Sequence, residues 1–349
     1  MVFFRKNKLF IILSLMISAS IVVLSFSVFA QIEDAKQQEL NSNHIKWVDF
    51  NVPVSAMEKA LKADIENHQN QYQTDFITLL SLLGAKYWGE WKRYKASDMD
   101  EFIQKLTLGE TKEDLAKNYE KYTYFNEVYK AVFSQMIGSY NIAKETDLQG
   151  NPIIEEKYGL KAYSPIAYGY SFSHCDDFGN SRSFGYKRNH LGNDLMTRVG
   201  TPIVAVESGI ITKCGWNKYG GWRIGIRSFD GLRYYYYAHC RKGHPFVEGI
   251  SEGTVVYAGQ PIGYVGMTGY SDTENVNGMK LPHLHFGMQL IFDPSQEEGD
   301  KEIWIDVYQI VKFLEHHKAV LTKDEGSKDY KSKYVFNDLA YDEYISRQN

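Results

Sequence analysis

The sequence predicts an α+β fold, in which a helical N-terminal domain precedes a domain built mainly on an antiparallel β-sheet. Between about residues 40 and 140 apolar residues recur at helical spacing, whereas after about residue 155 glycines become frequent and the apolar period falls to two. With 349 residues, of which 44% are apolar and 23% charged, the chain has enough material for two packed domains. We expect the helical domain at residues 31–154, the β domain at 155–317 and a charged, loosely ordered tail at 318–349.

The first thirty residues predict export. Three basic residues precede an apolar run of 22 residues from Leu9 to Ala30, which is long enough to span a bilayer. Val28-Phe29-Ala30 also has small residues in the positions that suit signal-peptide cleavage. A cleaved signal peptide and a membrane anchor through residues 9–30 both remain open. Either one places the rest of the chain outside the cytoplasm, secreted or anchored at the cell envelope.

Charge and cysteine content exclude two classes of protein. The net charge is −4, and without the three basic residues at the N-terminus it is 36 − 43 = −7. An acidic body with no basic block argues against nucleic acid as a partner, because such binding depends on neutralising phosphates. Cys175, Cys214 and Cys240 are too few for a disulfide framework, and at least one is unpaired. A pair between Cys214 and Cys240 stays open, and no thiol-protease pattern surrounds any of the three.

The predicted helices have apolar faces typical of core packing and carry no candidate catalytic or metal-binding cluster. Ser55-x-x-Glu58 and Ser97-x-x-Asp100 have the spacing of helix starts, and Phe76–Leu83 is a dense apolar run typical of a buried helix. A further stripe from Phe125 to Met136 ends before Gly138. No histidine, cysteine or paired-carboxylate cluster interrupts these stripes, so we interpret them as core packing.

The β domain is predicted from short strands joined by glycine-containing turns. Asp230-Gly231 is a hairpin turn between two of the strands, and Ile303–His317 is predicted to form a terminal helix. The predicted strands are Thr201–Lys213, Trp222–Phe229, Leu232–His239, Thr254–Ala258, Ile262–Val265 and His283–Phe292.

Two histidine motifs in this domain predict a metal site. His283 and His285 occupy alternate positions of an apolar strand, so both imidazoles point to the same face. His190 and Asp194 are four residues apart around a glycine, which suits a turn that brings two ligands to one ion. Two imidazoles and a carboxylate suit a catalytic zinc ion, which keeps one position for water. His239, at the end of another strand, strengthens this interpretation.

Taken in order, the motifs of the β domain resemble those of the lysostaphin-type, or LytM-like, zinc endopeptidases of peptidase family M23. The resemblance covers about residues 155–317. It rests on His190-x-Gly192-x-Asp194, Gly200-Thr201-Pro202, Tyr237-Ala238-His239, Gly266-Met267-Thr268-Gly269 and His283-Leu284-His285-Phe286.

The resemblance implies a role for each polar residue of these motifs. It implies a LytM-like catalytic domain that holds one zinc ion through His190, Asp194 and His285. His239 and His283 would then be catalytic groups and not ligands. The implied partner is bacterial peptidoglycan, cut within its short peptides. The sequence departs from the family pattern at Cys240, which we interpret as packing, and at Leu195–Arg198, which lies beyond the ligands.

Other functions remain open at this point. A catalytically restrained domain could bind the cell wall or activate a partner hydrolase, and a secreted sugar-binding module could carry an incidental His-x-His. The sequence does not indicate what the helical domain recognises, and it assigns no role to His174 or His244. Aromatic side chains near the motifs could line a groove or could simply favour strands; they are Trp216, Tyr219, Trp222 and Tyr234–Tyr237.

Overall fold

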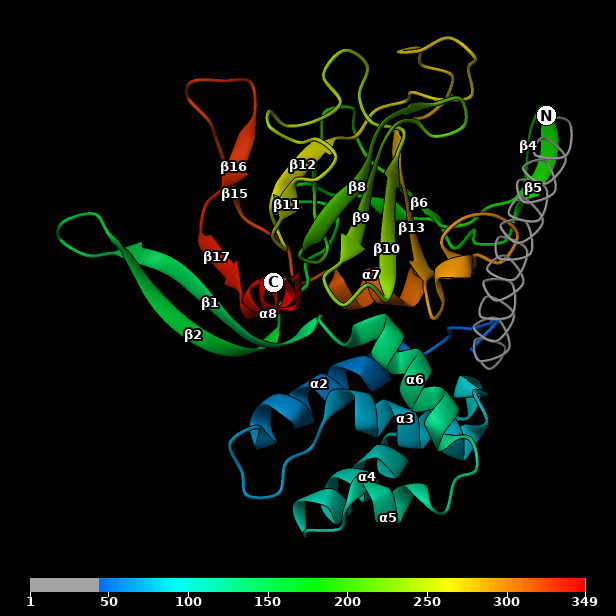
Figure 1. The fold of residues 1–349 in the computed structure, drawn as a ribbon, viewed down its shortest axis with the longest axis vertical. Coiled ribbons are helices and arrows are strands. Elements are labelled where there is room, and N and C mark those ends of the chain that lie inside the picture. The colour runs from blue at the N-terminus through cyan, green and yellow to red at the C-terminus, as the bar shows by residue number, and fades with distance from the viewer. Residues whose placement is uncertain (1–43, 349) are drawn as a thin grey trace, which may run out of the picture. The chain divides into compact units, whose positions relative to one another are not determined.

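The computed structural model describes residues 44–348, and a helical part precedes the first strand as the sequence predicts (Figure 1). The helical part contains α2 (Val54–Asn67), α3 (Phe76–Tyr87), the 3-10 turn η2 (Trp91–Arg93), α4 (Ala96–Thr107), α5 (Lys112–Ala116) and α6 (Tyr122–Phe133). The predicted export segment at residues 1–30 lies outside the described residues. Within residues 44–348, no helix has both the length and the apolar character needed to cross a membrane.

Core packing, more than end-capping by serine, sets the helices. In α3, Phe76, Leu79 and Leu83 are at most 1% exposed, as expected for a buried helix. This helix is capped by Asp75, whose carboxylate accepts the Thr78 N–H at 2.6 Å. The capping box predicted at Ser55 is wrong, because α2 begins one residue earlier and no side chain caps it. The start predicted at Ser97 is displaced in the same way, since α4 begins at Ala96 without a side-chain cap.

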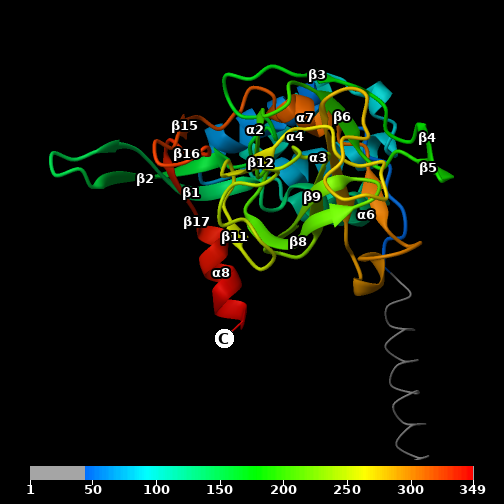
Figure 2. The ribbon, with the colours of Figure 1, turned by 90° about the horizontal axis from the view of Figure 1, so that it is seen from above.

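A three-stranded sheet follows the helices and includes the C-terminal segment. β1 (Ile137–Thr146) pairs with β2 (Pro152–Leu160) and with β17 (Val335–Asp338). The β1–β2 hairpin projects away from the other strands (Figures 1 and 2). The segment that was expected to be loosely ordered forms β15 (Leu321–Lys323), β16 (Tyr330–Ser332), β17 and α8 (Leu339–Gln348). A buried ion pair between Lys161 and Asp338 helps to hold β17 in place.

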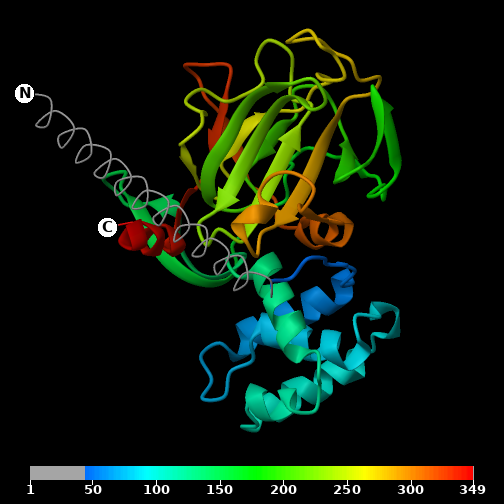
Figure 3. The same cartoon turned by 45° about the vertical axis from the view of Figure 1, so that its right-hand side comes forward.

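The largest element is an antiparallel sheet of eight strands, which confirms the predicted fold class (Figure 3). Its order is β11-β8-β9-β10-β13-β6-β3, and β14 also pairs with β13. These strands are β3 (Ser173–His174), β6 (Asn193–Met196), β8 (Gly209–Asn217), β9 (Gly221–Ser228), β10 (Arg233–Ala238), β11 (Val255–Val256), β13 (His283–Leu290) and β14 (Ile303–Ile305). Two small antiparallel pairs accompany it, β4 (Ser181–Phe184) with β5 (Tyr186–Asn189) and β7 (Pro202–Val204) with β12 (Pro261–Tyr264).

Two predicted elements differ from the structure. The single strand expected over Thr201–Lys213 is interrupted by a bend at Val206 and Glu207, and its halves, β7 and β8, pair with different partners. The helix expected over Ile303–His317 is a strand, β14, followed by the shorter α7 (Tyr308–Leu314). The Asp306 side chain accepts the Tyr308 N–H at 2.9 Å at this change of conformation.

Alternation along the strands gives the large sheet one buried face and one open face. Ile224, Tyr235, Tyr237 and Phe286 point to the buried face and are 0% exposed. The positions between them project to the open face, where polar side chains and glycines predominate. His285 belongs to this second set, so the sheet presents it on its open face.

The helical part and the sheet meet at a fully buried arginine. The Arg233 guanidinium donates to both Glu207 carboxylate oxygens, at 2.8 and 2.9 Å, and to the Ala131 carbonyl at 2.7 Å. Ala131 belongs to α6, so one side chain of β10 joins the two parts. α7 lies between the lower end of the sheet and the helices (Figures 1 and 3), and its residue Phe313 stacks on Phe76 of α3. Both parts belong to one compact unit, Trp47–Asn349, and independent folding of residues 155–317 stays a prediction.

Replacing Arg233 by alanine should lower the free energy of unfolding by about 3–5 kcal/mol, because it leaves the buried Glu207 carboxylate without its ionic partner. Arg227→Ala is the matched control. Its guanidinium contacts Glu297 at 2.9 Å, but the two side chains are 26% and 47% exposed, so a loss of about 0–1 kcal/mol is expected. Urea unfolding of both variants measures the difference. Equal losses of unfolding free energy in the two variants would show that the buried network does not stabilise the contact between the helical part and the sheet.

Candidate active site

The five residues predicted to carry chemistry lie together at one end of the sheet's open face. His285 of β13 is directly opposite Asp194 of β6 and is also paired with Ala238 of β10. His239 follows Ala238, and its backbone N–H donates to the Gly220 carbonyl at 2.7 Å. His190 comes directly after β5. The register of three neighbouring strands therefore brings together residues that are up to 95 positions apart in the sequence.

Three of these residues bring a potential ligand atom to one point. His190 Nε2 lies 2.7 Å from His285 Nδ1 and 3.1 Å from Asp194 Oδ1, and the third separation, His285 Nδ1 to Asp194 Oδ1, is 3.3 Å. The ligands of a tetrahedral zinc ion stand about 3.3 Å apart, given bonds of about 2.0–2.1 Å. All three side chains are less than 20% exposed, at 7%, 16% and 13%. The donor set and its spacing therefore fit zinc.

An outer layer of polar groups orients His190. Its Nδ1 lies 3.1 Å from the Asp177 carbonyl oxygen and 3.2 Å from the Asp177 carboxylate. These two oxygens only accept, so they favour a proton on Nδ1, although the donor Arg182 Nη2 also lies 3.1 Å away. Nε2 faces the cluster. Arg182 contacts the Asp177 carboxylate and reaches Asp194 Oδ2 at 3.3 Å, so it holds both carboxylates in position.

Electrostatics favours a positive charge within the cluster. Burial alone would lower the pKa of His190, but Asp177 and Asp194 outweigh it and raise this pKa to about 9. Burial would raise the pKa of Asp194, yet hydrogen bonds from His190 and His285 hold it well below its usual value. Two imidazole lone pairs at 2.7 Å repel each other unless a proton or a metal cation lies between them.

His239 and His283 form a second pair beside the cluster, with ring centroids 4.8 Å apart. In each ring Nδ1 faces a backbone carbonyl, that of Thr268 at 2.7 Å for His239 and that of Leu281 at 2.9 Å for His283. Each Nδ1 therefore donates, which leaves Nε2 as the acceptor in the neutral ring. Burial, reinforced by the neighbouring His283 and His285, lowers the pKa of His239 well below its usual value.

The free nitrogen of His283 points toward the cluster. Its Nε2 is buried without a hydrogen-bond partner among the described residues and lies 3.7 Å from Asp194 Oδ1. Buried polar atoms are rarely left unsatisfied, and those that are often have a role in catalysis. The structure thus separates the two histidines of the His-x-His motif: His285 is part of the three-residue cluster and His283 lies beside it.

Gly192 is the glycine of the His-x-Gly-x-Asp motif, and the structure explains why no side chain fits there. A Cβ at this position would lie 2.5 Å from the Phe286 carbonyl oxygen and 2.9 Å from the His285 ring. The chain must therefore pass directly against His285 to place His190 and Asp194 on either side of it.

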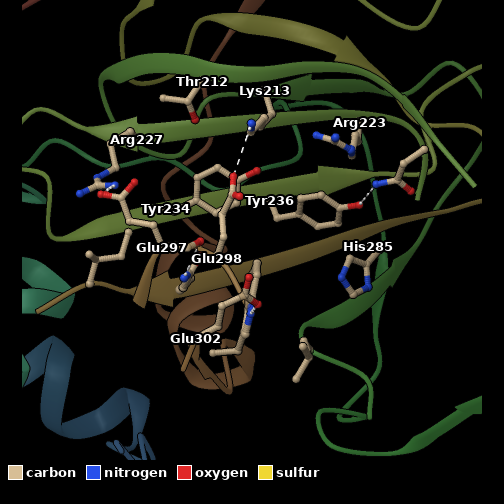
Figure 4. A pocket seen from close by; sticks show the side chains of 15 residues that line it. Thr212, Lys213, Arg223, Arg227, Tyr234, Tyr236, His285, Glu297, Glu298 and Glu302 are labelled. Carbon is tan, nitrogen blue, oxygen red and sulfur yellow. Dashed lines mark hydrogen bonds and ion pairs between the residues drawn. The ribbon is translucent and has the colours of Figure 1, made fainter. Parts of the chain in front are cut away.

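Two cavities meet at the cluster. The smaller, of about 160 Å³, contains the five residues and is bordered by Arg188, which lies over the rings of Tyr219 and Tyr270. The larger, of about 620 Å³, follows the open face of the sheet (Figure 4). Leu191, Tyr236 and His285 line both cavities, so the two cavities are adjacent.

Of the aromatic residues that the sequence analysis singled out, some line the two cavities and others are buried in the core. Tyr219 and Tyr236 line the smaller cavity, and Tyr234 and Tyr236 line the larger. Tyr235 and Tyr237 are fully buried on the other face of the sheet. Trp216 and Trp222 line neither cavity and pack against each other, with centroids 5.7 Å apart.

The remaining histidines and the cysteines lie outside the cluster. The His174 ring packs on Tyr308, and burial lowers its pKa to about 4. His244 Nε2 pairs with Asp329 at 2.6 Å. All three cysteines are free, so the pair between Cys214 and Cys240 does not form. Burial raises the pKa of Cys214 to about 11, and Cys240 is fully buried, so neither is a ready nucleophile.

Comparison with known proteins agrees with this geometry. Residues 188–297 match the model of peptidase family M23. The chain is 34% identical over 192 residues to the L-Ala--D-Glu endopeptidase of Bacillus subtilis (strain 168), covering 52% of this chain and 55% of that protein. It is 40% identical over 99 residues to the glycyl-glycine endopeptidase ALE-1 of Staphylococcus capitis, covering 28% of this chain and 24% of that protein. The chain thus spans about half or less of the length of these curated relatives.

A solved structure extends the likeness in fold beyond the matched segment. A LytM protein from Ruminococcus gnavus ATCC 29149 superposes with a TM-score of 0.52 at 24% identity, over 76% of this chain and 89% of that one. The likeness shows that the two proteins share a fold. The match of residues 188–297 to peptidase family M23 confirms the predicted resemblance for this part of the chain.

Proposed function

We propose that this protein is a zinc-dependent endopeptidase that hydrolyses peptide bonds in the stem or cross-bridge peptides of bacterial peptidoglycan. The observation that carries the proposal is the convergence of His190, Asp194 and His285 beside two histidines whose Nε2 atoms are acceptors. The proposal includes an extracytoplasmic location, by secretion or by anchoring through residues 9–30, because peptidoglycan lies outside the membrane.

His190, Asp194 and His285 would hold the zinc ion, through Nε2, a carboxylate oxygen and Nδ1 respectively. When bound, zinc supplies a Lewis acid that polarises a carbonyl and lowers the pKa of water toward neutrality. Asp177 orients the His190 ring, and Arg182 orients Asp194, so that Nε2 and the carboxylate both face the cluster.

His239 and His283 would move the protons of the reaction. As the water oxygen bonds to the scissile carbonyl carbon, the Nε2 of one ring accepts the proton that the water loses. The carbon–nitrogen bond then breaks, and the leaving nitrogen takes a proton from an imidazolium Nε2. The backbone carbonyls of Thr268 and Leu281 stabilise either ring in its protonated form, because they accept from Nδ1.

The named activities of the relatives support peptides of the cell wall as the substrate class. One relative is named for the bond between L-Ala and D-Glu, and the other for a glycyl-glycine bond. Similarity to the first extends over 192 residues and to the second over 99. The residues beside the two bonds differ in charge, because glutamate carries a free carboxylate and glycine has no side chain.

Digestion of purified peptidoglycan by the full-length protein tests the proposal. Mass analysis of the soluble fragments should show new amino termini within the peptides and no new reducing ends on the glycan. A chelator should abolish release and added zinc should restore it. Stoichiometric zinc with no cleaved peptide would contradict the proposal and favour a catalytically restrained domain that binds the wall or activates a partner.

The outer layer allows a separate prediction about metal affinity. Asp177→Ala should weaken zinc binding by about 10–100-fold, because the carboxylate beside His190 Nδ1 is lost. Asp176→Ala is the matched control, since this neighbouring carboxylate is exposed and makes no contact with the cluster. Competition with a chromophoric zinc chelator measures both affinities. An unchanged affinity in Asp177→Ala would mean that the carboxylate does not orient His190.

A further inference from the structure

The larger cavity is a groove along the open face of the sheet, with one end at His285 (Figure 4). Its floor comes from β8, β9, β10 and β13, and the segment from Glu297 to Glu302 forms one wall. Leu191, Tyr236 and His285 line both cavities, so a peptide that extends from the cluster along the open face of the sheet would enter this groove. Side chains along the groove therefore face the residues next to the scissile bond.

Glycines on the open face make room for the groove. Gly225 of β9 lies under the Tyr234 ring, and a Cβ there would meet the Tyr234 hydroxyl at 2.1 Å. Gly215 of β8 is paired with Arg223 of β9 and has no side chain to cover it. The guanidinium of Arg223 consequently projects into the groove between the two hairpin strands and the tyrosines (Figure 4).

Of the three cations that line the groove, two already have carboxylate partners. Lys213 Nζ lies 3.6 Å from Glu298, and Arg227 lies 2.9 Å from Glu297. Arg223 has no carboxylate within ion-pair distance among the described residues, and its Nε is buried without a hydrogen-bond partner. An arginine presents five donors, and leaving a buried one unpaired costs free energy.

Glu302, the third glutamate that lines the groove, already accepts hydrogen bonds from its own segment of the chain. Glu302 accepts the Trp304 indole N–H at 2.7 Å and the Gly299 N–H at 3.3 Å. Tyr236, beside Arg223, accepts a hydrogen bond from Asn217 at 3.4 Å, so its own O–H remains available as a donor. Arg223 and Tyr236 thus both offer hydrogen-bond donors to the groove next to the cluster.

We propose that Arg223, assisted by Tyr236, is a subsite for a free carboxylate of the peptide substrate. The inference rests on the proposed function and narrows it, because it makes acidic peptides the substrate class. A planar guanidinium binds a carboxylate through two parallel hydrogen bonds, which positions the peptide as well as attracting it. The carboxylate would give the guanidinium the anionic partner that the described residues do not supply.

The test compares two synthetic stem peptides on the full-length, zinc-loaded protein. One carries a free carboxylate on the residue next to the scissile bond, and in the other that group is a carboxamide. The wild-type protein should favour the carboxylate by about 10–100-fold in kcat/KM, mostly through KM, as expected for a hydrogen bond to a charged group. Arg223→Gln should lose this preference while cleaving the carboxamide peptide within about threefold of the wild-type rate.

Arg227→Gln is the matched control, because it removes a cation from the same groove that is already paired with Glu297. It should keep the preference. A third peptide, amidated at its C-terminus, distinguishes the two sources of a carboxylate: a loss of preference there alone would place the chain terminus, and not the acidic residue, on Arg223. Equal cleavage of all peptides by the wild-type protein, or a preference that survives in Arg223→Gln, would overturn the proposal.

Calorimetric binding keeps the subsite separate from the proposed function. If no peptide is cleaved, the endopeptidase proposal fails. A binding preference for the carboxylate peptide that disappears in Arg223→Gln would nevertheless support the subsite. Equal binding of the carboxylate and carboxamide peptides by the wild-type protein would overturn it.

Discussion

His285→Ala should lose both zinc and activity. The substitution leaves His190 and Asp194 as the remaining two of the three proposed ligands. The loss of zinc affinity should exceed the about 10–100-fold that removal of an outer hydrogen-bonding partner costs. Turnover on cell walls should fall with the metal content, and excess zinc should restore only part of it.

The exposed His316 provides the control for this variant, because it is an imidazole outside the cluster. His316→Ala should retain the zinc content and the turnover of the wild-type protein. Full zinc occupancy in His285→Ala at micromolar zinc would exclude His285 as a ligand.

His283→Ala should keep its zinc and still lose most of its activity. All three proposed ligands remain, so about one zinc ion per chain is expected. The Nε2 that lies 3.7 Å from Asp194 is removed, and loss of a proton-transfer group costs about 10²–10⁴ in rate. His239→Ala should behave in the same way, because its Nδ1 is held by the Thr268 carbonyl as that of His283 is by Leu281.

Single-turnover rates and zinc content should be measured on the same preparations of these two variants. A rate within about tenfold of the wild-type protein would remove the variant's histidine from the proposed proton transfer. Loss of zinc would instead identify the substituted histidine as a metal ligand.

Much of the site could be predicted because its signals are local. The alternation of His283 and His285 on an apolar strand, and the glycine between His190 and Asp194, fix which side chains can meet. The structure adds the strand register, which brings β6, β10 and β13 together. No local pattern specifies that register by itself.

The outer layer could not be predicted from spacing. Asp177 lies thirteen residues before His190, in a loop, and Arg182 belongs to the short strand β4. Their contacts depend on how this loop folds back over β6, which neither periodicity nor a motif encodes. Thr268 and Leu281 act through backbone carbonyls, so their side chains give no signal. Arg223 is notable because of a partner that it lacks, and only the three-dimensional arrangement reveals this.

The two predicted elements that differ from the structure do so for similar reasons. The apolar run over Thr201–Lys213 satisfies a strand pattern throughout, but Glu207 turns inward to bind Arg233, and the strand is divided there. The segment from Ile303 has apolar residues that suit a helix, yet its first three residues complete the sheet by pairing with β13. In both places a tertiary contact decides between alternatives that the local sequence allows.

Anomalous scattering at the zinc absorption edge, from crystals of the protein grown with zinc, would identify the side chains that hold the ion. We expect one strong peak within bonding distance of His190 Nε2, the Asp194 carboxylate and His285 Nδ1, with His283 and His239 beside it but not bonded. A peak bonded to His283 in place of His285, or no peak at this cluster in protein that cleaves peptidoglycan, would contradict this expectation.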